Sequence, residues 1–227
     1  MSCFDSYACD YEEALNRGLA LSGESKDYFA TGRLAWLSQC LKGLNIDVRR
    51  VLDFGCGTGT ATPLFFELLG AQSVLGVDPS EMSLSVAREK YSGLPVTFEL
   101  VDEFKPQADV DLVFCNGVFH HILKGDRQRS AQYVANALRP NGVFAMWENN
   151  PWSPAARYVM SRIPFDRNAV MVWPGEARTL AEQAGLSVVR TDYAFIFPKK
   201  LQFLRVLEPS VRRLPLGAQY QVLSLKQ

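Results

Sequence analysis

Long apolar runs, paired cysteines, histidines and net charge are all scarce or missing in this sequence. The five cysteines are odd in number and lack CxxC spacing, so neither disulfides nor a zinc site are expected. The expected compartment is the reducing cytoplasm. No run approaches the ~18 apolar residues that span a bilayer, and the N-terminus does not resemble a signal peptide. The formal net charge of +0 argues against a dedicated nucleic-acid partner.

The order of short apolar runs and helical stretches predicts an α/β fold. Strands are expected at 48–54, 73–78, 95–101, 110–115, 142–148, 187–197 and 218–225. Strands that are apolar throughout and separated by helices indicate a parallel sheet covered on both faces. No full crossover separates the last two strands, so they are expected to be antiparallel at the sheet edge. We predict an N-terminal helical lid over 1–45 and a main domain over 46–227.

The stretch VLDFGCGTGTATP places Gly55, Gly57 and Gly59 directly after a buried strand. Glycines let the backbone turn sharply and let a ligand lie against the main chain. In the helix that follows, Thr62 is the expected N-cap, Pro63 the first helical residue and Gly70 the end.

The residues around this loop argue against a dinucleotide ligand. The spacing is G-x-G-x-G rather than G-x-G-x-x-G, with Thr60 at the third-glycine position. Asp53 precedes the loop and would repel a pyrophosphate, but it would suit a cationic ligand. Asp78 ends the next strand, where a carboxylate can accept hydrogen bonds from both ribose hydroxyls. A ribose beside a cationic group, without a pyrophosphate, describes S-adenosyl-L-methionine.

Five segments in order then resemble the class I S-adenosylmethionine-dependent methyltransferases: VLDFGCGTG, VLGVDPSEMSL, Asp102 after the third strand, DLVFCNGVFHHI and LRPNGVFAMWE. The resemblance covers about 48–150 and implies a three-layer Rossmann-like sandwich with a seven-stranded, mostly parallel sheet and an antiparallel last strand. It also implies that the cofactor is held through these residues: Asp53 and the loop of Gly55, Cys56, Gly57 and Gly59 at the methionine part, Asp78 at the ribose, Pro79 and Met82 at the adenine face, Asp102 at the adenine amino group, and Asn116 at the amino acid end.

His120 and His121 follow the fourth strand beside this loop. A neutral imidazole can take a proton from a hydroxyl acceptor, so either histidine is a candidate catalytic base. Adjacent side chains point in different directions, so at most one is expected to face the substrate, and the other would pack against the sheet. A metal site is not expected, because no carboxylate cluster accompanies the pair.

Several residues are candidates for contacts with the substrate. The stretch ENNPWSP resembles the motif by which DNA amino-methyltransferases grip a base, but it has one proline too few and follows the wrong strand. It still lies at the carboxyl end of a strand, so its side chains are candidates for a small-molecule pocket. The predicted substrate contacts are Tyr7, Tyr11, Asn149, Trp152 and Arg157.

The basic segment PKKLQFLRVLEPSVRRLP is expected to form a helix over 199–208. With α-helical spacing, its leucines and Phe203 would cover the sheet edge, while Lys199, Lys200 and Arg205 would point outward. The surface would then be either an ordinary solvated face or a site for an anionic or lipid-linked substrate.

The sequence therefore predicts a methyltransferase that acts on a small molecule, mainly by positioning, with or without a histidine base. Whether methylation occurs at oxygen, nitrogen or carbon, and which oligomer forms, is left open. Two alternatives keep the fold and cofactor but change the role: an enzyme with non-methylating chemistry, or a non-catalytic partner subunit.

Overall fold

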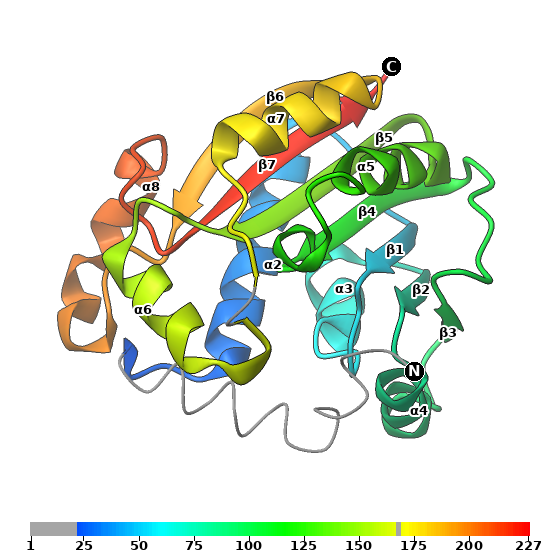
Figure 1. Ribbon diagram of the computed structural model, residues 1–227, viewed down its shortest axis with the longest axis horizontal. Coiled ribbons are helices and arrows are strands. Elements are labelled where there is room, and N and C mark those ends of the chain that lie inside the picture. The colour runs from blue at the N-terminus through cyan, green and yellow to red at the C-terminus, as the bar shows by residue number, and fades with distance from the viewer. Residues whose placement is uncertain (1–21, 167–168) are drawn as a thin grey trace.

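Seven strands form one sheet in the order β3-β2-β1-β4-β5-β7-β6 within residues 22–166 and 169–227, the part of the chain that the computed structural model describes (Figure 1). Strand β7 is antiparallel to both β5 and β6, and the other neighbouring pairs are parallel. The predicted fold class is confirmed. The strands are β1 Arg50–Phe54, β2 Ser73–Asp78, β3 Val96–Leu100, β4 Val110–Asn116, β5 Leu138–Asn149, β6 Leu186–Ala194 and β7 Gln219–Lys226.

Helices cover both faces of this sheet. α2 (Lys26–Gly43) and α3 (Thr62–Leu69) contribute to one buried cluster, while α5 (Arg127–Ala137) and α7 (Pro174–Gln183) contribute to the cluster on the other face. α4 (Glu81–Lys90) packs against β2 and β3. The strands can be apolar on both sides because each side is covered. The remaining helical segments are η3 Phe119–His121, α6 Pro154–Arg162, η4 Pro164–Asp166, η5 Lys199–Leu207 and α8 Glu208–Val211.

Several element ends differ from the sequence prediction. β5 begins at Leu138 rather than at 142, because Leu138 pairs with Val110 across a register shift. α3 begins one residue early: Ala61 is its N-cap, so the prediction of Thr62 was wrong, whereas Gly70 ends the helix with a left-handed φ of 70° as predicted.

The helix α2 belongs to the core. Its Leu34 and Leu37 are fully buried and pack with residues of the sheet in one cluster. Only the first turns of α2 reach the region that we describe below as the candidate site. Tyr7 and Tyr11 lie outside the described residues, so the lid over the start of the chain stays a prediction.

The basic segment is oriented differently from the prediction. η5 is a 3-10 helix with no buried residue, and Phe203 and Val206 are 70% and 79% exposed. Arg205 instead stacks over the Tyr28 ring, and Arg212 stacks over Trp36. The prediction was wrong because the backbone has 3-10 turns, with 3.0 residues per turn, and a kink at Leu201, so α-helical spacing does not apply. In the described part of the chain, no helix combines the length and apolar character that crossing a membrane requires.

Arg127 at the start of α5 anchors the segment that leads from η4 to α7. Its side chain is fully buried and donates to the carbonyl oxygens of Ile122 and Val170, and it pairs with Glu176. A buried guanidinium with three partners is a fixed attachment point, because leaving any of those acceptors unpaired costs free energy.

We therefore expect Arg127→Ala to lower the free energy of unfolding by about 3–5 kcal/mol, because it breaks a buried ion pair and frees two buried carbonyls. Arg129→Ala, two residues along the same helix but exposed, is the matched control and should change stability by less than about 0.5 kcal/mol. Urea unfolding measures the free energy of unfolding of both variants. Equal values for the two would contradict the anchoring role of Arg127.

Candidate active site

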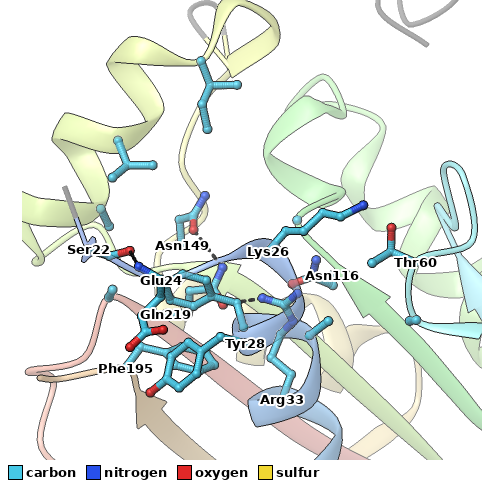
Figure 2. Close-up of a pocket in the computed structure, with 18 of the residues that line it drawn as sticks. Ser22, Glu24, Lys26, Tyr28, Arg33, Thr60, Asn116, Asn149, Phe195 and Gln219 are labelled. Carbon is cyan, nitrogen blue, oxygen red and sulfur yellow. Dashed lines mark hydrogen bonds between the residues drawn. The ribbon is translucent and has the colours of Figure 1, made fainter. Parts of the chain in front are cut away.

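A cavity of about 510 Å³ lies at the carboxyl ends of β1, β4 and β5, where an open α/β sheet binds its ligands. Residues from α2, the glycine loop, η3, η4, α6 and the segment after β6 line it (Figure 2). Figure 2 shows Arg33 extending from α2 toward Asn116 and Gln219, and its guanidinium donates to Gln219 Oε1 at 2.9 Å. The cavity therefore brings together segments from both ends of the chain.

The glycine loop is held in a shape that only glycine adopts easily. Gly55, Gly57 and Gly59 have φ angles of 76°, 52° and 74°, in the left-handed region. A Cβ atom at Gly55 would come within 2.3 Å of Val118 Cγ2, whereas one at Gly57 would meet nothing within 4 Å. The main chain of Gly57 thus faces open space in the cavity wall, and a ligand can lie directly against it.

Asp78 at the end of β2 fixes the loop from behind. Its Oδ2 accepts from the Gly57 amide at 2.9 Å, and its Oδ1 accepts from the Ser80 amide at 2.9 Å. Ser80 then caps α4 by accepting a hydrogen bond from the Ser83 amide. A carboxylate has about four acceptor positions, so one that holds the loop can also accept from a ribose.

Asp53 is a buried carboxyl in the cavity wall, 4% exposed. Burial and, to a smaller extent, the nearby charge of Asp78 raise its pKa to about 7, although the charge of Arg33 opposes the rise. A cationic ligand beside Asp53 would favour the ionised form. The ionised form of Asp53 is therefore unfavourable in the protein alone and becomes favourable when a positively charged ligand binds beside it.

Two buried oxygen atoms in the same wall have no hydrogen-bond partner within the described chain: Thr58 Oγ1 and Asn116 Oδ1. Buried polar groups are normally paired, so such atoms beside a cavity call for a ligand or water. Together with Asp53 and the loop amides, they fit a ligand with amino, carboxylate and hydroxyl groups.

The cavity gathers about half of the predicted site residues. Asp53, Gly55, Cys56, Gly57, Asn116, His120, His121 and Asn149 line it. Gly59, Asp78, Pro79, Met82, Asp102, Trp152 and Arg157 do not appear in its wall.

The residues outside the wall have identifiable environments. Met82 is 46% exposed, and Asp102 and Arg157 are also on the surface. The exposed Trp152 stacks on Trp173 and Tyr193 rather than facing the cavity. The neighbouring Asn150, also a sequence candidate for the pocket, is fully buried and donates to the carbonyls of Pro215 and Gly217.

Both histidines face the same carboxylate. The 3-10 turn η3 brings their rings to a centroid separation of 4.1 Å, and both line the cavity. The expectation that they point apart therefore does not describe this structure. Their Nε2 atoms lie 3.5 Å (His120) and 3.2 Å (His121) from Asp166 Oδ1, which η4 brings to the pair.

Glu148 holds His120 from the other side. It is 1% exposed, accepts from the Phe119 amide at 2.8 Å and lies 2.5 Å from His120 Nδ1. Burial alone would lower the pKa of His120, but the nearby carboxylates of Glu148 and Asp166 outweigh it and raise the pKa to about 10. In the protein alone, His120 is therefore a cation clamped between two carboxylates.

Sequence reasoning missed Glu148 and Asp166. Glu148 had a visible signal, since it is the charged residue that ends the apolar run GVFAMW. Asp166 had no such signal in the sequence, because it lies far from the histidines along the chain. Only the fold of the segment after α6 brings it to them. The two carboxylates supply the cluster that the sequence seemed to lack.

The raised pKa of Asp53 predicts a pH-dependent stability. The pKa of the folded carboxyl, about 7, lies above its ordinary value of 3.8, so folding binds a proton between these values. Stability should fall as pH rises from about 4 to 7 and stay lowered above, by a few kcal/mol.

Asp53→Asn removes this pH dependence and should raise the Tm more at pH 8 than at pH 5. Asp47 is exposed, so Asp47→Asn is the control and should show no such difference. Thermal denaturation followed by circular dichroism measures both, and an equal gain at the two pH values would show that Asp53 is ionised throughout.

Comparison with known proteins agrees with this geometry. A methyltransferase domain family matches residues 52–144. A trans-aconitate 2-methyltransferase of Rhizobium leguminosarum bv. trifolii is 32% identical over 99 residues, covering 44% of this chain and 38% of that protein. A ribosomal protein L11 methyltransferase of Vibrio campbellii is 30% identical over 121 residues, covering 52% of this chain and 40% of that one. The chain thus matches less than half the length of these two relatives.

The fold is also shared beyond the matched stretch. A crystal structure of a methyltransferase from Archaeoglobus fulgidus superposes with a TM-score of 0.66 at 19% identity, covering 89% of this chain and 95% of that one. The strand order, the glycine loop and the matched family agree with one another. Residues 52–144 therefore resemble the S-adenosylmethionine-dependent methyltransferases, and the described chain shares their fold.

Proposed function

We propose that this protein transfers a methyl group from S-adenosyl-L-methionine to a small-molecule acceptor bound in the cavity. The observation that supports this most is the division of one cavity into two chemically different walls. The glycine loop, Asp53 and Asn116 form one wall, and the histidines with Asp166 form the other. A donor and an acceptor held on facing walls can react by an in-line displacement, for which positioning is the main requirement.

The first wall suits the cofactor. When bound, S-adenosyl-L-methionine supplies an electrophilic methyl group on a sulfonium. Asp53 and the amides of the loop would hold its methionine part, and Asn116 Oδ1 would pair with its amino acid end. Asp78 would accept hydrogen bonds from the ribose while it keeps Gly57 in place. Pro79, Met82 and Asp102 would contact the adenine, at the exposed side of the site.

The remaining surface of the cavity supports an acceptor with a negative group. Lys26, Arg33 and Arg205 lie in the wall, although Arg205 is also paired with Glu24 at 2.9 Å. The relatives that methylate trans-aconitate act on a carboxylic acid, which agrees with such an acceptor. The enclosing aromatic side chains Tyr28 and Phe195 favour a small molecule over a protein surface.

The histidine wall would handle the proton of the acceptor. His120 is an unsuitable general base, because Glu148 and Asp166 keep it protonated. His121 is more exposed, with 18% of its side chain accessible, and its Nε2 is directed at Asp166. A hydroxyl acceptor would therefore lose its proton at the edge of the cavity that His121 and Asp166 form.

Isothermal titration calorimetry tests the cofactor site. We expect micromolar binding of S-adenosyl-L-methionine and of its demethylated product, and no binding of NAD. Asp78→Ala should weaken the binding by about 1.5–3 kcal/mol, because it removes hydrogen bonds to a charged acceptor and loosens the loop. Glu103→Ala, an exposed carboxylate beyond β3, should bind as the wild type does. NAD binding, or unchanged affinity in the Asp78 variant, would refute this site.

Turnover is tested with methyl-labelled cofactor and a metabolite extract fractionated by charge. We expect label to enter an anionic small molecule. His121→Ala should lower the methyl-transfer rate by about 10²–10⁴-fold without changing the affinity for the cofactor. The variant lacks the imidazole that would take the proton from the acceptor hydroxyl. If the variant instead loses thermal stability and keeps its turnover per folded molecule, the histidine wall is structural.

A further inference from the structure

The histidine wall contains three potential ligand atoms that converge on one point. One ring nitrogen of His120, one of His121 and one carboxylate oxygen of Asp166 lie within 4.8 Å of one another. The three residues line the cavity, and His120 and Asp166 are 4% and 7% exposed. Two imidazoles and one carboxylate are a common set for a divalent transition metal.

The Asp166 oxygen at the centre of this group lacks a hydrogen bond. Asp166 Oδ1 is buried and, within the described residues, no donor reaches it with hydrogen-bond geometry, although both imidazole Nε2 atoms are near. A buried carboxylate oxygen facing two imidazole nitrogens needs a positively polarised partner between them, which is either an N–H hydrogen or a metal ion. The poor hydrogen-bond geometry favours the metal.

The separations agree with a coordination polyhedron. Metal–ligand distances of about 2.1 Å place ligand atoms ~3.4 Å apart in a tetrahedral site and ~3.0 Å apart in an octahedral one. The Asp166 oxygen lies 3.5 Å from His120 Nε2 and 3.2 Å from His121 Nε2. Small side-chain movements would therefore suffice to bind an ion.

Glu148 supplies the outer support that metal-binding histidines usually have. It lies 2.5 Å from His120 Nδ1, on the ring edge opposite the proposed ligand atom. A carboxylate in this position fixes the ring and directs the lone pair of Nε2 toward the metal. Glu148 is itself fixed by the Phe119 amide, so the orientation of the ring is set by the sheet.

We propose that His120, His121 and Asp166 bind one divalent transition-metal ion, with Glu148 as the positioning residue for His120. Three protein ligands leave at least one coordination position for water or substrate, and the cavity gives that position access. Nitrogen and carboxylate ligands without thiolate favour Zn²⁺, Fe²⁺ or Co²⁺ over Ca²⁺ and Mg²⁺.

Cobalt is the most informative probe, because protein-bound Co²⁺ absorbs visible light and its spectrum reports the geometry. The full chain, without a histidine tag, is titrated with Co²⁺ in the absence of cofactor. We expect visible absorption bands that saturate at one equivalent and disappear when Zn²⁺ displaces the cobalt. His121→Ala and Asp166→Ala should weaken binding by at least 10-fold, and Glu148→Gln by about 10–100-fold.

Controls keep the outcome unambiguous. Asp47→Ala removes an exposed carboxylate from the loop between α2 and β1. This variant should bind Co²⁺ as the wild type does. His121 is the least buried of the ligands, so its variant is the one expected to keep the fold, which circular dichroism checks. Absence of saturable bands in the wild type, or unchanged binding in a folded His121→Ala protein, would overturn the proposal.

The metal site stands independently of methyl transfer, because the titration needs neither cofactor nor acceptor. If the proposed function also holds, a bound metal would contact an oxygen of the acceptor and lower the pKa of its hydroxyl. In that case the metal, rather than a free imidazole, would assist loss of the proton, and removing it by chelation would lower turnover without lowering cofactor affinity.

Discussion

The buried carboxylate of Glu148 is the group on which the histidine wall of the cavity depends. It sits at the end of the central strand β5 and accepts from the Phe119 amide while it lies against His120 Nδ1. A buried charge is tolerated only when it is paired and hydrogen-bonded, so η3 can take up essentially one position on the sheet. His120, His121 and their approach to Asp166 follow from that position.

A second carboxylate has the corresponding role for the glycine loop. Asp78 ends β2 and holds the Gly57 amide, so the glycine loop is fixed to its neighbouring strand as η3 is fixed to β5. The parallel sheet supplies both fixed points, because the carboxyl ends of its strands lie at one edge. Asp53 between them is left in an environment that disfavours its ionised form, as expected if the site binds the cationic ligand that we propose.

The sequence was sufficient for the parts of the site that are local. Apolar runs predicted the strands, and the Gly55–Gly59 spacing predicted the sharp turn after β1, because each depends on neighbouring residues. The carboxylates around the histidines were missed, since Glu148 and Asp166 reach them only through the tertiary fold. The basic segment was mispredicted for a local reason: its backbone is a 3-10 helix, so Phe203 is exposed and Arg205 turns toward Tyr28.

The contact between Gly55 and Val118 has a consequence for how such a protein can change over generations. Any side chain at 55 would meet Val118 at 2.3 Å, and Val118 directly precedes η3. The donor loop and the histidine turn are thus in steric contact. Substitutions in the two should be strongly epistatic: a variant selected for a new acceptor through residues near Val118 will alter the shape of the cofactor loop, so altered specificity and cofactor affinity will tend to be inherited together.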